Sequence, residues 1–317
     1  MRILKPLAIA LGGLVLLLVL AVAALGDRDI PREALLERYA SAESRFLTLA
    51  DGSVAHVREQ GSPSGETLVL VHGSNASLHT WEPWVARLGD AYRVISLDLP
   101  GHGLTGPTVE DDYSIDGMAR FVDVVTRILG AERFHLAGSS MGGRMAWIFA
   151  LSYPERVDRL ILLDASGFPD PPDQEVPLGF RVARTPVLQW LMLFVTPRDL
   201  FAVSLRNAFS DPTLVDDEMV GRYHELQLLE GSRAASLARF QLPSKDPRIA
   251  ELGRIRSPTL ILWGEEDRLT PASDAQLFAE AIPDSRVRIY PGVGHMPMEE
   301  APDRSAADVR AFLRGEI

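Results

Sequence analysis

The feature that most constrains the fold is a series of short apolar segments that alternate with helical patterns. Helical spacing of apolar residues marks 114–130, which ends at Gly130, and the C-terminal stretch 301–317. Apolar strands separated by helices are typical of a parallel sheet covered on both faces. The expected strands are 45–50, 53–59, 67–72, 92–99, 134–138, 159–165, 258–264 and 286–290. We therefore predict an α/β fold with a mostly parallel central sheet and helices on both faces.

The stretch 169–250 interrupts this alternation, because it contains several helical patterns and no convincing strand. It lies between two expected strands of the sheet. We predict that it forms a helical cap inserted into a single domain that covers residues 44–317. Within it, 186–195 is almost entirely apolar, which predicts a buried helix or one that faces an apolar ligand.

The N-terminus is expected to enter a membrane. Residues 6–25 carry no charge and follow the basic residues Arg2 and Lys5. A run of about 20 apolar residues spans a bilayer as a helix, and basic residues before it stay in the cytoplasm. We therefore predict a transmembrane anchor within 1–26.

A cleaved signal peptide is the alternative, because Ala21-Val22-Ala23 resembles a small-residue cleavage site and would release residues 1–23. In both cases a polar connector over 27–43 leads to a domain outside the cytoplasm, on the periplasmic side.

Composition excludes several classes of function. The net charge of −11 argues against nucleic acid as a partner. The chain has no cysteine, so it has no disulfide, thiolate nucleophile or cysteine metal site.

Small residues crowd the turn that follows the expected strand 134–138. A nucleophilic serine at a strand-to-helix turn needs glycine two positions before and two positions after it. Ser140 has Gly138 and Gly142 in these positions, whereas Ser139 has Ala137 and Met141. Ser140 is therefore the candidate nucleophile.

A serine hydroxyl needs a base that is itself oriented by a carboxylate. Of the seven histidines, only His295 follows the later strands, in a glycine-containing loop. For the acid, Asp267 lies beyond the strand 258–264, and Asp164, one strand earlier, is the alternative.

A tetrahedral intermediate also needs two donors for its oxyanion. The expected donors are the backbone amides of Met141 and Ser74, with Asn75 next in line. Asn75 is also expected to contact substrate, and Trp190, Leu191 and Phe194 are expected to line an acyl channel below the cap.

The chain resembles the α/β-hydrolase superfamily over residues 44–317. The matching motifs, in the family's order, are "HGSNASLHTW", "DLPGHGLTG", "GSSMGG", "WGEEDRLTP" and "GVGHMPMEEAP". The resemblance implies Ser140 as nucleophile, Asp267 as acid and His295 as base. The chain looks most like bacterial lipase and esterase branches, and it also resembles hydrolases that cleave C–C bonds in ring-fission products. The latter commonly have tryptophan after the catalytic histidine, where this chain has Met296.

Three functions are compatible with the sequence. The first is a membrane-anchored carboxylic ester hydrolase that acts on a small apolar ester through an acyl-enzyme. The second is a C–C bond hydrolase of the meta-cleavage type. The third is a non-catalytic binding protein, which a fluorophosphonate probe would leave unlabelled. No cofactor and no metal are expected: the serine turn lacks the lysine of a phosphate-binding loop, and no histidine–carboxylate spacing suggests a metal site.

Overall fold

A computed structural model describes residue 13 and residues 26–169, 181–182, 185, 188–243 and 246–317. The predicted membrane segment 6–25 lies outside the described residues, apart from Gly13. Within the part that is described, no helix is both long and apolar enough to cross a bilayer.

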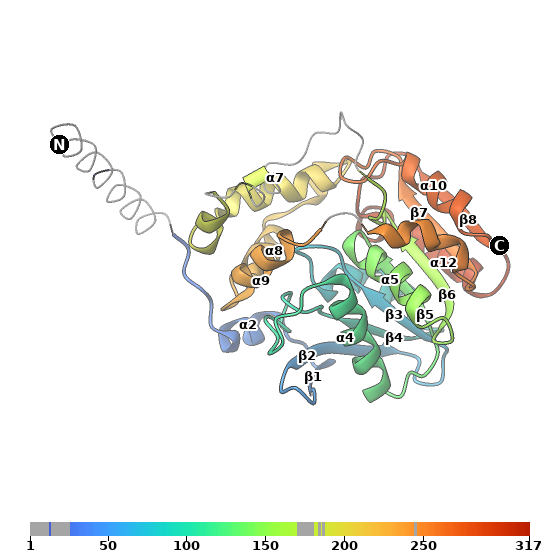
Figure 1. Ribbon diagram of the computed structural model, residues 1–317, viewed down its shortest axis with the longest axis horizontal. Coiled ribbons are helices and arrows are strands. Elements are labelled where there is room, and N and C mark those ends of the chain that lie inside the picture. Colours follow the sequence, from blue (N-terminus) through green and yellow to red (C-terminus); the bar gives the residue numbers. More distant parts are fainter. Residues whose placement is uncertain (1–12, 14–25, 170–180, 183–184, 186–187, 244–245) are drawn as a thin grey trace.

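An eight-stranded sheet forms the centre of the molecule, in the order β1-β2-β4-β3-β5-β6-β7-β8 (Figure 1). The strands are β1 (Ser44–Thr48), β2 (Val54–Gly61), β3 (Thr67–Val71), β4 (Arg93–Leu97), β5 (Phe134–Ser139), β6 (Val157–Leu163), β7 (Thr259–Gly264) and β8 (Ser285–Tyr290). Only the pairs β1–β2 and β2–β4 are antiparallel. The predicted mostly parallel sheet is confirmed, and each of its strands overlaps a predicted one.

Helices cover both faces of the sheet, because its central strands are apolar on both sides. Val69 and Val71 of β3 pack with α4 (Ile115–Ile128), α5 (Met141–Ser152) and α10 (Ser273–Ala281). Leu68 and Leu70 point the other way, toward α3 (Glu82–Leu88) and α12 (Pro302–Leu313). The short helices η1 (Leu78–Trp81) and α11 (Pro297–Glu300) complete this second layer. Parallel strands thereby bring their carboxyl ends to one edge of the sheet, where loops can gather functional groups.

The elements named in the described part of the insertion between β6 and β7 are all helices. It contains η2 (Leu188–Leu193), α7 (Arg198–Ala208), η3 (Pro212–Leu214), α8 (Asp217–Gln227), α9 (Ser232–Phe240) and η4 (Pro247–Arg254). Figure 1 shows α7, α8 and α9 together on one side of the sheet. In place of the α-helix predicted over 186–195 the structure has the six-residue 3-10 helix η2, and residues 186–187 lie outside the described residues.

The polar connector 27–43 is packed against the cap rather than free. It contains α2 (Arg32–Tyr39), whose Leu35 is fully buried with Leu104, Leu226 and Leu229. Ile30 N donates to Leu228 O at 2.7 Å, next to Leu229. Figure 1 shows α2 beneath α8 and α9. The connector is therefore part of the folded domain.

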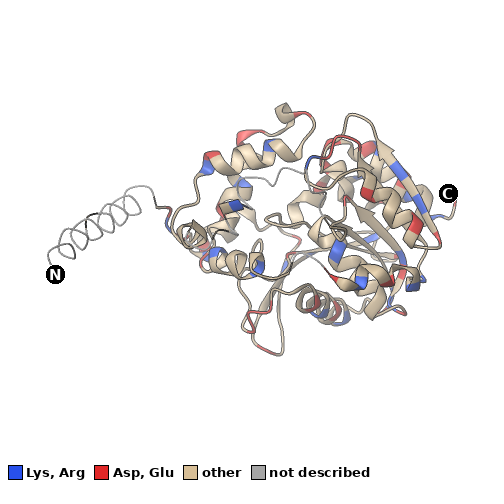
Figure 2. Cartoon of the chain, turned by 45° about the horizontal axis from the view of Figure 1, so that its top comes forward, with Lys and Arg blue, Asp and Glu red and all other residues tan. Residues whose placement is uncertain are grey.

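Charged residues of both signs are spread over the helices and loops of the domain, as Figure 2 shows, and in that view basic residues do not gather into one stripe.

Candidate active site

Ser140 occupies a strained turn between β5 and α5. Its φ of 54° and ψ of −116° lie in a region that costs a residue with a side chain about 1–3 kcal/mol. Two hydrogen bonds hold this conformation: Ser140 N donates to Leu163 O at 2.9 Å, and Ser166 N donates to Ser140 O at 3.1 Å. Ser139 is the last residue of β5 and is buried. Only Ser140 is therefore presented on the turn.

The glycines around the turn are required by close packing of backbones. A Cβ on Gly138 would overlap the carbonyl of Gly142, and a Cβ on Gly142 would overlap the carbonyl of His72. The tight strand-to-helix turn thus accounts for the density of small residues in the sequence.

Asp267 and His295 come together from the loops after β7 and β8. His295 Nδ1 lies 2.7 Å from Asp267 Oδ2, and both side chains are almost inaccessible to solvent. Asp267 engages Nδ1, which leaves Nε2 as the ring nitrogen that can take a proton from a nucleophile.

The Asp267 carboxylate is held by further donors. Leu269 N donates to Oδ1 at 2.7 Å, and Thr270 Oγ1 donates to Oδ2 at 2.6 Å. Burial alone would raise the pKa of Asp267, but the charge of His295 and these hydrogen bonds bring it below its ordinary value. Asp267 is therefore ionised at neutral pH, as an acid that orients a histidine must be.

The oxyanion loop, residues 72–77, lies directly against the nucleophile. A Cβ on Gly73 would stand 3.1 Å from Ser140 Cβ. Met141 is the first residue of α5, so its amide lies at the positive end of a helix. These positions are compatible with Ser74 N and Met141 N as oxyanion donors, which stays a prediction.

His72 orders this loop, as its buried position and contacts show. Its Nδ1 lies 2.7 Å from Gly73 O, and Leu99 N donates to its Nε2 at 3.0 Å. Burial lowers the pKa of His72, so the ring is neutral and serves as a hydrogen-bonding spacer.

The side chain of Asn75 is hydrogen-bonded to the cap. Its φ of 57° is left-handed, and its Oδ1 accepts a 2.7 Å hydrogen bond from Arg239 Nη2 of α9. Arg239 also donates to His102. Asn75 Oδ1 therefore already has a partner within the protein, and the expectation that Asn75 contacts substrate stays a prediction.

The sequence did not identify Arg239 as a residue of the site, because nothing in "LARFQ" distinguishes it from an ordinary helical arginine. Its guanidinium is buried between α9 and the oxyanion loop, and burial lowers its pKa to about 10. It remains a cation at neutral pH and bridges the cap to the loop beside Ser140.

The three residues expected to line an acyl channel lie on or near η2. Trp190 is 56% exposed and Phe194 is 52% exposed, while Leu191 is partly buried. None of them lines the small cavity at Asn75, whose walls are Asn75, Ala76, Ser77, His102, Gly103, Tyr223, Leu226 and Gln227. Trp190 and Phe194 are thus largely exposed among the described residues, and their place along an acyl channel stays a prediction.

Asp164 stands immediately behind the triad acid. It follows β6, it is fully buried, and its φ of 44° is left-handed. Its Oδ1 accepts a hydrogen bond from Gly264 N at 2.9 Å, whereas its Oδ2 has no partner. Burial and then the charge of Asp267 raise the pKa of Asp164 well above its ordinary value. Asp267, not Asp164, is the carboxylate paired with His295.

Asp164, Asp267 and His295 bring one potential ligand atom each within 4.8 Å of one another. This grouping does not resemble a metal site, because the facing atoms of His295 and Asp267 are already hydrogen-bonded to each other. Two negative charges at that separation would repel each other by about 3 kcal/mol at an effective dielectric constant of about 20. A proton on Asp164 removes this repulsion without any ion.

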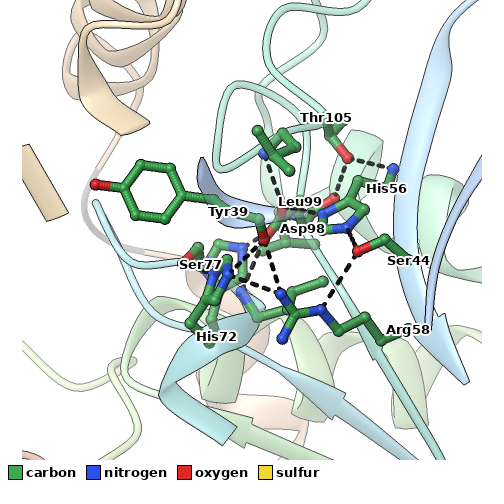
Figure 3. A network of polar contacts seen from close by, with 12 residues as sticks. Tyr39, Ser44, His56, Arg58, His72, Ser77, Asp98, Leu99 and Thr105 are labelled. Carbon is green, nitrogen blue, oxygen red and sulfur yellow. Dashed lines mark hydrogen bonds and ion pairs between the residues drawn. The ribbon is translucent and has the colours of Figure 1, made fainter. Parts of the chain in front are cut away.

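A second Ser-His-Asp arrangement lies far from this turn in the sequence (Figure 3). His56 Nδ1 lies 2.7 Å from Asp98 Oδ2, and His56 Nε2 lies 2.8 Å from Ser44 Oγ. Ser44 begins the regular strand β1, without the strained turn or the adjacent helix N-terminus of Ser140. Asp98 also accepts from Leu78 N and Leu104 N, which makes this buried cluster a structural network that fixes loops.

Comparisons with known proteins agree with this geometry. Residues 66–302 match the family model described as alpha/beta hydrolase fold. The chain is 30% identical over 280 residues to a 2-hydroxy-6-oxononadienedioate/2-hydroxy-6-oxononatrienedioate hydrolase from Comamonas testosteroni, covering 83% of this chain and 93% of that protein.

Two solved structures extend the comparison. A membrane phospholipase A, described as a bacterial virulence factor, is 27% identical with a TM-score of 0.72, and the match covers 99% of this chain and 96% of that one. A thermophilic esterase from Thermogutta terrifontis is 26% identical with a TM-score of 0.68, over 86% of this chain and 99% of that one. Since the family model covers most of the chain and the sheet, turn and loops follow its order, this protein belongs to the α/β-hydrolase family.

Proposed function

We propose that this chain is a serine hydrolase in which Ser140 attacks a carbonyl carbon. The observation that carries the proposal is the buried His295–Asp267 pair, 2.7 Å between Nδ1 and Oδ2, on the same sheet edge as the strained Ser140 turn. His295 Nε2 takes the Ser140 proton, and the amides of Ser74 and Met141 stabilise the oxyanion. His295 then returns the proton to the leaving group, and water releases the product bound to Ser140.

The sequence relatives favour a carbon–carbon bond as the bond that is cleaved, ahead of the ester that the sequence alone favoured. The relative from Comamonas testosteroni is named for hydrolysis of a 2-hydroxy-6-oxo dienedioate, and a relative from Burkholderia cepacia for a 2-hydroxy-6-oxo-6-phenylhexadienoate. In such a vinylogous diketone the leaving group is a carbon, which must receive the proton from His295.

Carboxylic ester hydrolysis is the second candidate, and two observations favour it. The match to the membrane phospholipase A extends over 99% of this chain. Met296, buried beside His295, replaces the tryptophan that is common in C–C hydrolases. An ester at a lipid surface would suit a chain attached to a membrane through residues 6–25.

One assay separates the two bonds. The purified full chain is given p-nitrophenyl esters from acetate to octanoate and, in parallel, a vinylogous 1,5-diketone acid, with Ser140→Ala as the blank. A kcat/KM at least about a hundred-fold higher for the diketone supports the C–C reaction, and the reverse ratio supports the ester reaction. If neither substrate turns over and a fluorophosphonate does not label the protein, the serine hydrolase proposal is wrong.

We further propose that residues 1–26 anchor the protein in a membrane with the domain on the periplasmic side. Arg2 and Lys5 before the apolar run support this orientation. Cell fractionation should find the full-length chain in the membrane pellet. A periplasmic form that begins near residue 24 would show instead that the segment is a cleaved signal peptide.

A further inference from the structure

Two buried aspartates meet where β6 and β7 end. The strands are parallel neighbours, with Leu163 opposite Leu262, so the residues that follow them lie side by side. Asp164 N donates to Leu262 O at 3.0 Å, and Gly264 N donates to Asp164 Oδ1 at 2.9 Å. The Asp164 carboxyl is thus fixed against the loop that carries Asp267.

The oxygens of these two carboxyl groups have different surroundings. Both oxygens of Asp267 accept hydrogen bonds, from Leu269 N, Thr270 Oγ1 and His295 Nδ1. Asp164 Oδ2 is fully buried and receives no hydrogen bond. A buried ionised oxygen without a donor is costly, whereas a protonated one is itself a donor and needs an acceptor.

Asp267 is the acceptor placed against Asp164, since an oxygen of each aspartate lies within 4.8 Å of the other and a side-chain hydrogen bond to Asp267 is among the causes that raise the pKa of Asp164. The other ionisable group facing Asp164 is Glu300, whose negative charge also disfavours an ionised Asp164.

We propose that Asp164 is a neutral carboxylic acid that donates a hydrogen bond from Oδ2 to the Asp267 carboxylate and so positions the catalytic pair. The donated bond stabilises the ionised form of Asp267 and keeps it from taking the proton of His295. The inference rests on the proposed function, because Asp267 matters to catalysis only if it is the triad acid.

A left-handed backbone at Asp164 fits this role. A residue other than glycine at a φ of 44° is strained, and the strain is kept where the surroundings require it. The peptide carbonyl of Asp164 lies 3.2 Å from Thr270 Oγ1, while the single hydroxyl proton of Thr270 goes to the nearer acceptor, Asp267 Oδ2 at 2.6 Å. The backbone of Asp164 is therefore held next to a residue that donates to the Asp267 carboxylate.

Infrared spectroscopy tests the protonation state without any enzyme assay. The difference spectrum of the wild-type chain minus Asp164→Asn at pH 7 should show the carbonyl stretch of a buried protonated carboxyl group. Asp98 is the matched control, because it too is fully buried, yet hydrogen bonds and the charge of His56 outweigh burial and lower its pKa. Asp98→Asn should remove no such band. If Asp164→Asn also removes none, Asp164 is ionised and the proposal is overturned, whether or not the chain is a hydrolase.

Kinetics test the positioning role. Asp164→Asn keeps the shape and, through its amide, a donor to Asp267, so it should retain most of the kcat that Asp164→Leu loses. Asp164→Leu should lower kcat by about ten-fold or more at similar KM, and the more basic Asp267 should move the acid limb of kcat/KM up by about one pH unit. If Asp164→Asn is as inactive as Asp267→Asn, Asp164 acts as a charged acid and the proposal is wrong. If Asp164→Leu does not fold, the infrared spectrum and the kcat of Asp164→Asn still test whether Asp164 is a neutral donor.

Discussion

Ser139 and Ser140 are neighbours of the same type in different surroundings. Ser139 ends β5 and is buried, whereas Ser140 occupies the strained turn beside the oxyanion loop. The spacing of glycines in the sequence correctly predicts that Ser140, and not Ser139, occupies the turn, because a tight strand-to-helix turn requires glycine at fixed offsets.

Replacing each serine in turn tests which one reacts. Ser140→Ala should reduce kcat by at least about a thousand-fold, since covalent catalysis is lost while binding remains. Ser139→Ala should stay within about ten-fold of wild type. Fluorophosphonate labelling followed by peptide mapping gives the independent measurement. Labelling at Ser139, or at Ser44 of the second Ser-His-Asp cluster, would contradict the assignment.

The residues that support the triad could not be read from the sequence. Asp164 and Asp267 both follow strands; the family resemblance favours Asp267 as the acid, and the hydrogen bond to His295 in the fold distinguishes it from Asp164. Arg239 contacts Asn75 across 164 residues of sequence, and no local pattern records such a pairing.

At the level of whole elements, strands were predicted well and the cap less so. Each strand is a dense apolar run, and burial on both faces of a parallel sheet demands such runs. The 186–195 stretch is equally apolar, yet its described part is a 3-10 turn with Trp190 exposed. Hydrophobicity alone does not reveal which surface an insertion presents.

The bridge from α9 to the oxyanion loop makes a testable link between cap and site. Arg239→Met should lower kcat by about ten-fold with little change in KM, because Asn75 loses the donor that holds its left-handed backbone. Arg198→Met, on the exposed surface of α7, is the control and should have no effect. Equal kcat values for the two variants would show that the loop is held without Arg239.

The end of the cap is fastened by Asp246, which pairs with Arg248 and Arg144. The hydrogen bond from Arg248 lowers the pKa of Asp246 to about 2. A lowered pKa adds stability above the ordinary value near 4, and this stability is lost as the pH falls toward 2.

Asp246→Asn should therefore lower the free energy of unfolding by about 1 kcal/mol at pH 7, allowing for solvent screening. The difference should vanish near pH 2. Urea unfolding at both pH values measures it, and Asp284→Asn, at an exposed ion pair, provides the control. A loss of equal size at both pH values would mean that the charge of Asp246 is not the cause.

For the molecule as a whole, the proposed anchor and η2 should meet the same bilayer. Asp27 N donates to Phe194 O at 2.9 Å, and Thr196 N donates to Asp27 Oδ2 at 2.7 Å, so Asp27 lies against the residues that directly follow η2, the element that carries the exposed Trp190. The other four tryptophans, Trp81, Trp84, Trp147 and Trp263, are fully buried. Tryptophan quenching by the bilayer would therefore report on η2 alone.

The full chain reconstituted in vesicles should lose part of its tryptophan fluorescence when the lipids carry brominated acyl chains. Trp190→Phe should abolish the effect, and adding Ile128→Trp, on the exposed side of α4, should not restore it. Protein that floats with vesicles without quenching would show that η2 faces away from the bilayer. Protein that does not float would contradict the anchor itself.

The docked connector also has a mechanical consequence. Asp27 and Asp29 fasten the start of the domain to the cap, through Phe194, Thr196 and Arg233. Only after them along the chain does α2 reach the DLPGHGLT loop, through Arg32 and Leu35, and β2, through the Tyr39 carbonyl. A pull on the N-terminus therefore passes first into the cap, and only then into the sheet that carries Ser140. A force or a tilt applied through the proposed N-terminal anchor would therefore displace the cap before it displaces the turn that carries Ser140.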